Sequence, residues 1–294
     1  SVTGLRIEIM GRKAGLGRWR GFSCLEFVPT NNGRYKSTTL SLPSYKGGNL
    51  GTMQNSSASG ISNSWLASVN YTTVNKNAWA SAFNTMYLGN NLKVCRLFIN
   101  VGGDYVTYQL FNSDWSGLKT IESDNLQDFF ANVVPTGLKI IPVLTSHTGI
   151  PNSVYNIALT PNPAYQTRTN FINRMGDVMN LLTPYKSKIA MWEIINEPNL
   201  SMGINVSAQN IRDLLELYYD LVKTKDTTVP VGVSHQSPVF FLYHSALIDG
   251  TADVIQYHFY GQTPFFPNSS TPLGVIPEVM QLPCVMGEGR YVDG

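Results

Sequence analysis

Short, mostly apolar runs recur along the chain, and polar or turn-forming residues follow each run. Runs of this length and composition are typical of strands that are buried on both faces of a parallel sheet. We predict seven such strands, at residues 22–28, 92–101, 138–144, 190–195, 229–234, 253–259 and 283–287.

Most gaps between these runs carry apolar residues at helical intervals. We predict helices at residues 77–88, 123–134, 164–182, 207–223 and 239–247, and Ser123 is a suitable N-cap for the second of them. Strands that alternate with helices indicate βαβ crossovers and a parallel sheet, so the predicted fold class is α/β.

The N-terminal part follows a different pattern. Residues 5–10 alternate between apolar and charged side chains, and a turn-like stretch follows at 11–17. This pattern predicts a hairpin within residues 1–20, placed as a plug at one end of the domain. Residues 29–64 are rich in Gly, Ser, Asn and Pro. We expect a long first loop there, forming one wall of a cleft.

Length and composition favour one domain over residues 1–294, because α/β barrels run near this size. A doubly wound sheet is the rival, but the Gly-rich first turn typical of that fold is missing. The net charge of +2 gives no reason to expect nucleic acid or acidic lipid as a partner, and no apolar run approaches membrane-spanning length. Cys24, Cys95 and Cys284 lie in strand-like runs without metal-ligand spacing, so we expect buried thiols.

Polar residues gather after the carboxyl ends of the predicted strands, which share one face of a parallel barrel. They are Glu26, Arg96, His147, Asn196, Glu197, His235, His258, Tyr260 and Glu288. An amide and a carboxylate directly after a buried strand, as at Asn196 and Glu197, are costly inside a core and fit an active-site cleft. A solvated turn is the alternative interpretation of these two residues.

Glu197 and Glu288 each follow a strand, and such carboxylates can face each other across a barrel mouth. One can attack an anomeric carbon while the other protonates the leaving oxygen and later deprotonates water. Asn196 suits a hydrogen bond to a sugar 2-hydroxyl. Arg96, His258 and Tyr260 are candidates for keeping the nucleophile ionised.

Several of these residues have structural alternatives. Arg96 could pair with a buried acid, and His147 and His258 could cap strands. A metal site built from histidines lacks the usual HxH or HxxxH spacing, so we expect no metal and no cofactor. Trp115, in the loop after the strand predicted at 92–101, is a better candidate for a sugar-stacking platform than Trp192. Trp192 lies inside a predicted strand and is expected in the core.

The polar residues that follow the predicted strands, taken in their order along the chain, resemble those of the clan A glycoside hydrolases, family 5 most of all. The resemblance rests on Asn196-Glu197-Pro198 and Gly287-Glu288, supported by Arg96, His147 and His258-Phe259-Tyr260, and it spans residues 19–290. It implies a (β/α)8 TIM-barrel fold and retaining hydrolysis of a β-linked glycan or oligosaccharide. Glu197 would then be the acid/base and Glu288 the nucleophile.

The sequence departs from that family at its end. Only residues 289–294 follow Glu288, so the eighth strand and helix and their tryptophan are missing or replaced, and Gly289-Arg290 stands where an aromatic-glycine pair is usual. A catalytically weak carbohydrate-binding barrel or a truncated hydrolase is therefore the alternative function. A barrel lyase or aldolase would need a Schiff-base lysine or a metal cluster, which the sequence does not suggest. We expect a secreted monomer.

Overall fold

The computed structural model describes residues 5–8, 24–27, 47–51, 65–99, 110–235, 250–259 and 284–289. The strands are β1 (Leu5–Glu8), β2 (Cys24–Phe27), β3 (Gly47–Gly51), β4 (Val94–Phe98), β5 (Lys139–Val143), β6 (Trp192–Asn196), β7 (Val231–His235), β8 (Val254–Phe259) and β9 (Cys284–Gly289). The α-helices are α1 (Thr73–Ala82), α2 (Thr120–Asp128), α3 (Asn152–Tyr155), α4 (Arg168–Leu182) and α5 (Ala208–Lys225).

A seven-stranded sheet runs from β3 to β9 in chain order, and all its neighbouring strands are parallel. The prediction of an α/β fold with a parallel sheet is therefore confirmed. Sequential order places each strand beside the one that precedes it along the chain. Because all the strands are parallel, their carboxyl ends lie together at one edge of the sheet.

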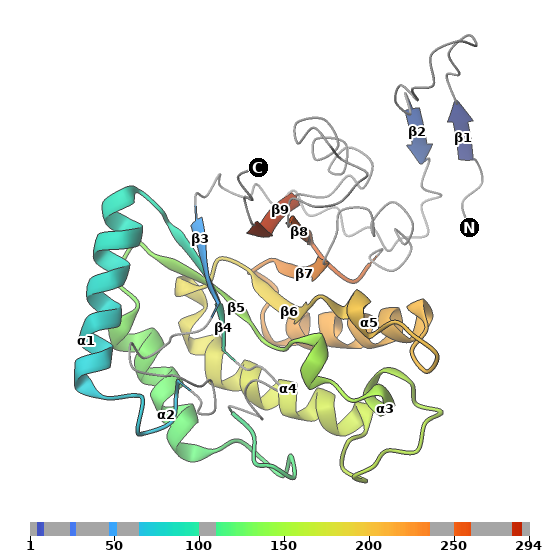
Figure 1. Cartoon of the computed structure of the whole chain (residues 1–294), viewed down its shortest axis with the longest axis horizontal. Coiled ribbons are helices and arrows are strands. Elements are labelled where there is room, and N and C mark those ends of the chain that lie inside the picture. The colour runs from blue at the N-terminus through green and yellow to red at the C-terminus, as the bar shows by residue number, and fades with distance from the viewer. Residues whose placement is uncertain are drawn as a thin grey trace, which may run out of the picture.

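Helices α1, α2, α4 and α5 lie along one side of the strand array (Figure 1). Their buried side chains, among them Leu126, Met175 and Leu214, join strand residues such as Leu97 and Ile194 in one apolar core. Burial of these side chains holds the helices on the sheet. Within the described part of the chain, no helix is long and apolar enough to cross a membrane.

The strands after residue 90 follow the prediction closely, but the N-terminal part does not. The run at 22–28 forms β2, which pairs antiparallel with β1 and lies outside the parallel sheet. The prediction placed the partner of β1 within residues 1–20, whereas the strand that pairs with β1 is β2 at Cys24–Phe27. The first parallel strand is β3, inside the stretch that we expected to be a loop at 29–64.

The starts of two helices can be compared with their predicted starts. Helix α2 begins at Thr120 after Lys119, so Ser123 lies buried within the helix instead of capping it. The predicted helix at 239–247 lies outside the described residues. By contrast, α5 begins directly after Ser207, where the prediction placed its start.

Candidate active site

Strand β6 carries the residues around which the site is built. Side chains alternate between the two faces of a strand. Trp192 points toward the helices, where its indole Nε1 donates a hydrogen bond to Asp226 at the end of α5, at 2.9 Å. Glu193 therefore points to the opposite face of the sheet. There it meets side chains from β4, β7 and β8.

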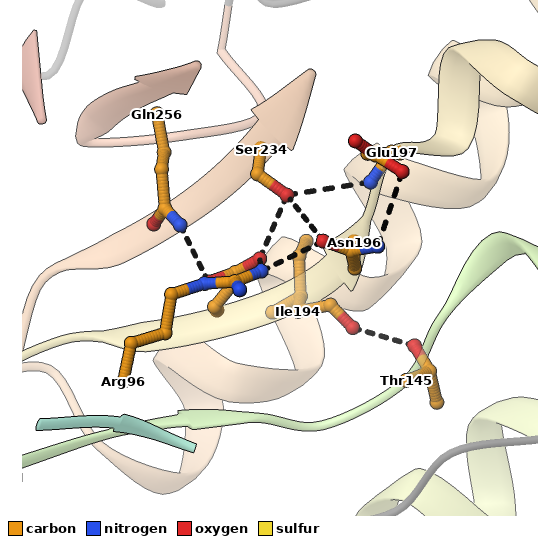
Figure 2. A network of polar contacts seen from close by, with 8 residues as sticks. Arg96, Thr145, Ile194, Asn196, Glu197, Ser234 and Gln256 are labelled. Carbon is orange, nitrogen blue, oxygen red and sulfur yellow. Dashed lines mark hydrogen bonds and ion pairs between the residues drawn. The ribbon is translucent and has the colours of Figure 1, made fainter. Parts of the chain in front are cut away.

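Glu193 is fully buried, with 0% exposure, and its carboxylate accepts four hydrogen bonds. Oε2 accepts from Arg96 Nε and from Gln256 Nε2, each at 2.7 Å. Oε1 accepts from Arg96 Nη2 at 2.6 Å and from Ser234 Oγ at 2.7 Å. A buried carboxylate is stable only when its charge and lone pairs are satisfied in this way. Figure 2 shows Arg96, Ser234 and Gln256 pointing toward this centre.

The same arginine also fixes the side chain of Asn196. Arg96 Nη2 donates to Asn196 Oδ1 at 2.7 Å, which commits the amide oxygen to the guanidinium. The amide nitrogen then faces the other way, and Asn196 Nδ2 lies 3.5 Å from Glu197 Oε2. Asn196 therefore presents an N–H donor beside the Glu197 carboxylate.

Glu197 follows β6 in an unusual backbone conformation. Its φ of 52° and ψ of 48° lie in the left-handed region, which costs a residue other than glycine on the order of 1–3 kcal/mol. Pro198 contributes to this choice, because a following proline disfavours the right-handed helical region. The Glu197 N–H contacts the carbonyl oxygen of Ser234 at 3.1 Å and its Oγ at 3.3 Å. Held in this way, the Glu197 side chain is 8% exposed at the end of the sheet.

His147 lies beside the glutamate, at the start of a short 3-10 turn after β5. Burial lowers the pKa of His147 below its usual value, although the negative charge of Glu197 and a hydrogen bond with the Asn196 backbone act to raise it. A histidine with a lowered pKa is neutral near pH 7. The ring can then serve as a hydrogen-bonding group beside Glu197 without adding a positive charge.

The structure brings together the predicted residues Arg96, His147, Asn196 and Glu197. Of the other predicted partners, His258 lies on β8 and Glu288 on β9. Glu288 on β9 pairs through its backbone with His258 on β8. The side chains of both residues, and all of Tyr260, lie outside the described part of the structure, so their assignment stays a prediction.

The prediction for Trp115 is wrong. Its ring is 2% exposed and packs against Phe111, Tyr165 and Phe171, with centroid separations between 6.0 and 6.5 Å. The faces of the ring are therefore taken up by the core and are not free to stack on a sugar. Trp192 is buried as expected.

Sequence reasoning missed Glu193, Ser234 and Gln256. A signal for Glu193 was present, since it is a lone charge inside an otherwise apolar strand, as is Arg96 on β4. Two opposite charges in separate buried strands must be paired to be tolerated. Ser234 and Gln256 are uncharged, and nothing in the sequence pattern distinguishes them from other strand residues.

The fold of the described sheet and helices is similar to that of solved β-mannanase and β-mannosidase structures. No known family profile matches this sequence, and no curated protein matches it. Solved structures do match. The resemblance to the clan A glycoside hydrolases is confirmed at the level of the fold.

Among these structures is a β-1,4-D-mannanase from Cryptopygus antarcticus, with a TM-score of 0.54 and 16% identity over 73% of this chain and 69% of that chain. A β-mannanase from the blue mussel Mytilus edulis gives a TM-score of 0.52 and 14% identity over 82% and 77%. An exo-β-1,4-mannosidase from Opitutaceae bacterium strain TAV5 gives 0.55 and 9% identity over 83% and 45%. At these identities the likeness concerns the fold.

Proposed function

We propose that this protein hydrolyses β-linked glycosides with retention of configuration, with Glu197 as the acid/base and Glu288 as the nucleophile. The observation that carries the proposal is the Asn196–Glu197 pair at the end of β6, where a buried charged network fixes the amide beside the carboxylate. The Asn196 N–H donor suits the 2-hydroxyl of a bound sugar. Hydrogen bonds to that hydroxyl strengthen in the transition state of glycoside cleavage.

The mechanism needs the two carboxyl groups about 5–5.5 Å apart. Neighbouring strands are about 4.8 Å apart, so the three spacings from β6 to β9 would separate the glutamates too widely in a flat sheet. The proposal therefore includes a sheet that curls into a barrel. Successive register partners connect Asn196 on β6 to Val285 on β9. Glu197 and Glu288 follow these two residues closely in the sequence, so both lie near the same end of the sheet.

The network around Glu193 supports such a curled sheet. Arg96, Glu193 and Gln256 come from β4, β6 and β8, which are alternate strands. In a (β/α)8 barrel each interior layer is built from the side chains of alternate strands. These three side chains fit one such layer, beneath the mouth where Glu197 lies.

The choice of substrate follows from the structural neighbours that are named as β-mannanases and a β-mannosidase. We take β-1,4-mannan and β-mannosides as the first substrates to test, and β-1,4- and β-1,3-glucans as the next. Because polysaccharides of this kind are found outside the cell, the proposal includes secretion of the enzyme.

The test is a hydrolysis panel of these polysaccharides and of aryl β-glycosides, run on the parent chain, Glu197→Gln and Glu288→Gln. We expect turnover in the parent and a loss of at least about 100-fold in each variant. General acid–base catalysis by Glu197 contributes that much or more, and the covalent step cannot form without the Glu288 carboxylate. Thermal unfolding of all three proteins checks that they are folded. A folded parent that binds these glycans without cleaving any of them would refute the proposal and favour a carbohydrate-binding role.

A further inference from the structure

We propose that Glu193 is a positioning residue, which orients Asn196 and Glu197 for catalysis through Arg96 and Ser234. This inference rests on the proposed function, since it assigns a part in that reaction to a residue that never meets the substrate. Glu193 lies four residues before Glu197 and is fully buried, with 0% exposure. Any influence on the reaction must therefore pass through its neighbours.

The first connection runs through Arg96. Two hydrogen bonds from one guanidinium to one carboxylate fix the plane of the arginine, because the donors of that group have a rigid geometry. The plane in turn sets the direction of the bond from Arg96 Nη2 to Asn196 Oδ1. Glu193 thereby determines which way the Asn196 amide faces.

The second connection runs through Ser234. Its hydroxyl has one proton, and the closest acceptor is Glu193 Oε1 at 2.7 Å, while Asn196 Oδ1 is 3.2 Å away. With the proton given to Glu193, the oxygen of Ser234 is free to accept the Glu197 N–H at 3.3 Å. Ser234 thus joins Glu193 to the backbone of Glu197, at the residue whose left-handed conformation needs such support.

Stability gives no reason for a charged network at this place. A buried ion pair can be replaced by apolar side chains of similar volume at little cost, and often with a gain in stability. A polar network, however, fixes directions that apolar packing leaves free. Because the network contacts the Asn196 amide and the Glu197 backbone, it is suited to positioning these two residues.

Gln256 offers a matched control. Ser234 and Gln256 each donate one hydrogen bond of 2.7 Å to Glu193, but only Ser234 also contacts Glu197. Ser234→Ala and Gln256→Met therefore remove comparable support from Glu193. Only the first of these substitutions also removes a side-chain contact to the Glu197 N–H, while the contact of that N–H with the carbonyl oxygen of residue 234 remains.

The experiment compares two aryl β-glycosides that differ only in their leaving group, phenol or 2,4-dinitrophenol. Their sugar is the mono- or disaccharide whose glycosides the parent hydrolyses fastest. Departure of phenol needs a proton from the acid, whereas departure of 2,4-dinitrophenol does not. For Glu193→Gln and Ser234→Ala, we expect kcat/KM for the phenyl glycoside to fall about 10- to 100-fold more than for the dinitrophenyl glycoside, as a misplaced catalytic group would cause. For Gln256→Met the two losses should be equal.

The outcomes separate this inference from the proposed function. An active parent whose Glu193→Gln and Ser234→Ala variants lose the same factor with both leaving groups would overturn the inference and leave the proposed function intact. The same holds if Gln256→Met matches Ser234→Ala. A folded parent without turnover of any glycoside would overturn both. Should Glu193→Gln fail to fold, Ser234→Ala against Gln256→Met decides.

Discussion

Strand β6 places two carboxylates four residues apart in very different surroundings. Glu193 accepts hydrogen bonds from three strands, so its position is fixed. Glu197 follows the strand, with an amide N–H donor at 3.5 Å and a histidine beside it. The first environment suits a structural anion, and the second suits a group that exchanges protons with a ligand.

The position of His147 leads to a prediction about its pKa. The charge of Glu197 raises that pKa, so removing the charge in Glu197→Gln should lower it further. Titration of the histidine ring protons by NMR, with His147→Asn for assignment, measures the shift. Asp220→Asn, an exposed change on α5, is the control and should leave it unaltered. A pKa that is unchanged or higher in Glu197→Gln would contradict the placement of the two side chains.

The lowered pKa of His147 also sets a direction for stability. Protonation is harder in the folded protein than in the unfolded chain, so the unfolded state binds more protons below the usual value of 6.5. The contribution of His147 to the free energy of unfolding is therefore fully present above that pH. It decreases as the pH falls through 6.5 toward the folded-state pKa. Urea unfolding of the parent and His147→Asn at pH 8 and pH 5 should show this difference.

The buried pair of Arg96 and Glu193 should show strong coupling. Arg96→Met leaves the Glu193 charge buried without its partner, which we expect to cost about 3–5 kcal/mol. The double variant Arg96→Met/Glu193→Leu removes both charges and should be more stable than either single variant. Urea unfolding of the four proteins measures the cycle. Additive losses would show that the two side chains do not depend on each other.

The site was predictable only in part. Asn196 and Glu197 stand at the end of β6 and His147 follows β5, and a change from apolar to polar residues marks such ends directly in a sequence. Arg96 is visible as a lone charge inside the apolar run of β4. The partners of Arg96 could not be assigned, because they depend on strand register and on which strands curve toward each other. The burial of Trp115 depends on rings from separate elements, Phe111, Tyr165 and Phe171, which no local pattern connects.

At the scale of elements, prediction succeeded where burial on both faces leaves a continuous apolar run. Strands β4 to β9 all coincide with such runs. Strand β3 has the sequence Gly-Gly-Asn-Leu-Gly, which carries no apolar run and resembles a loop. Strand β2 has the apolar run, but its pairing with β1 depends on tertiary contacts that its own sequence does not specify.

Helix α5 allows a direct test of one local rule. Ser207 and Asn210 form a capping box, in which Ser207 Oγ accepts the Asn210 N–H at 3.1 Å and Asn210 Oδ1 accepts the Ser207 N–H at 2.9 Å. Ser207→Ala should lower the free energy of unfolding by about 1 kcal/mol. Ser81→Ala, an exposed position inside α1, should change it by less than about 0.5 kcal/mol. Equal effects in urea unfolding would mean that the cap does not stabilise α5.

For the whole molecule, the parallel order of the strands is what creates a site. Seven strands in chain order present their carboxyl ends at one edge, so residues far apart in the sequence are gathered there. The helices cover one side of the sheet, and the network of Glu193 occupies the other. This arrangement leaves the proposed catalytic chemistry to the residues that follow the strands.

The most direct test of the central claim is to trap the covalent intermediate. An aryl 2-deoxy-2-fluoro-β-glycoside of the preferred sugar, with a dinitrophenyl leaving group, forms the glycosyl-enzyme faster than water releases it in a retaining enzyme. We predict a mass increase of one fluorosugar per chain, located by peptide sequencing on Glu288 and absent from Glu288→Gln. A label on another carboxylate, or an active enzyme that releases the inverted anomer and takes up no label, would contradict the two-glutamate account.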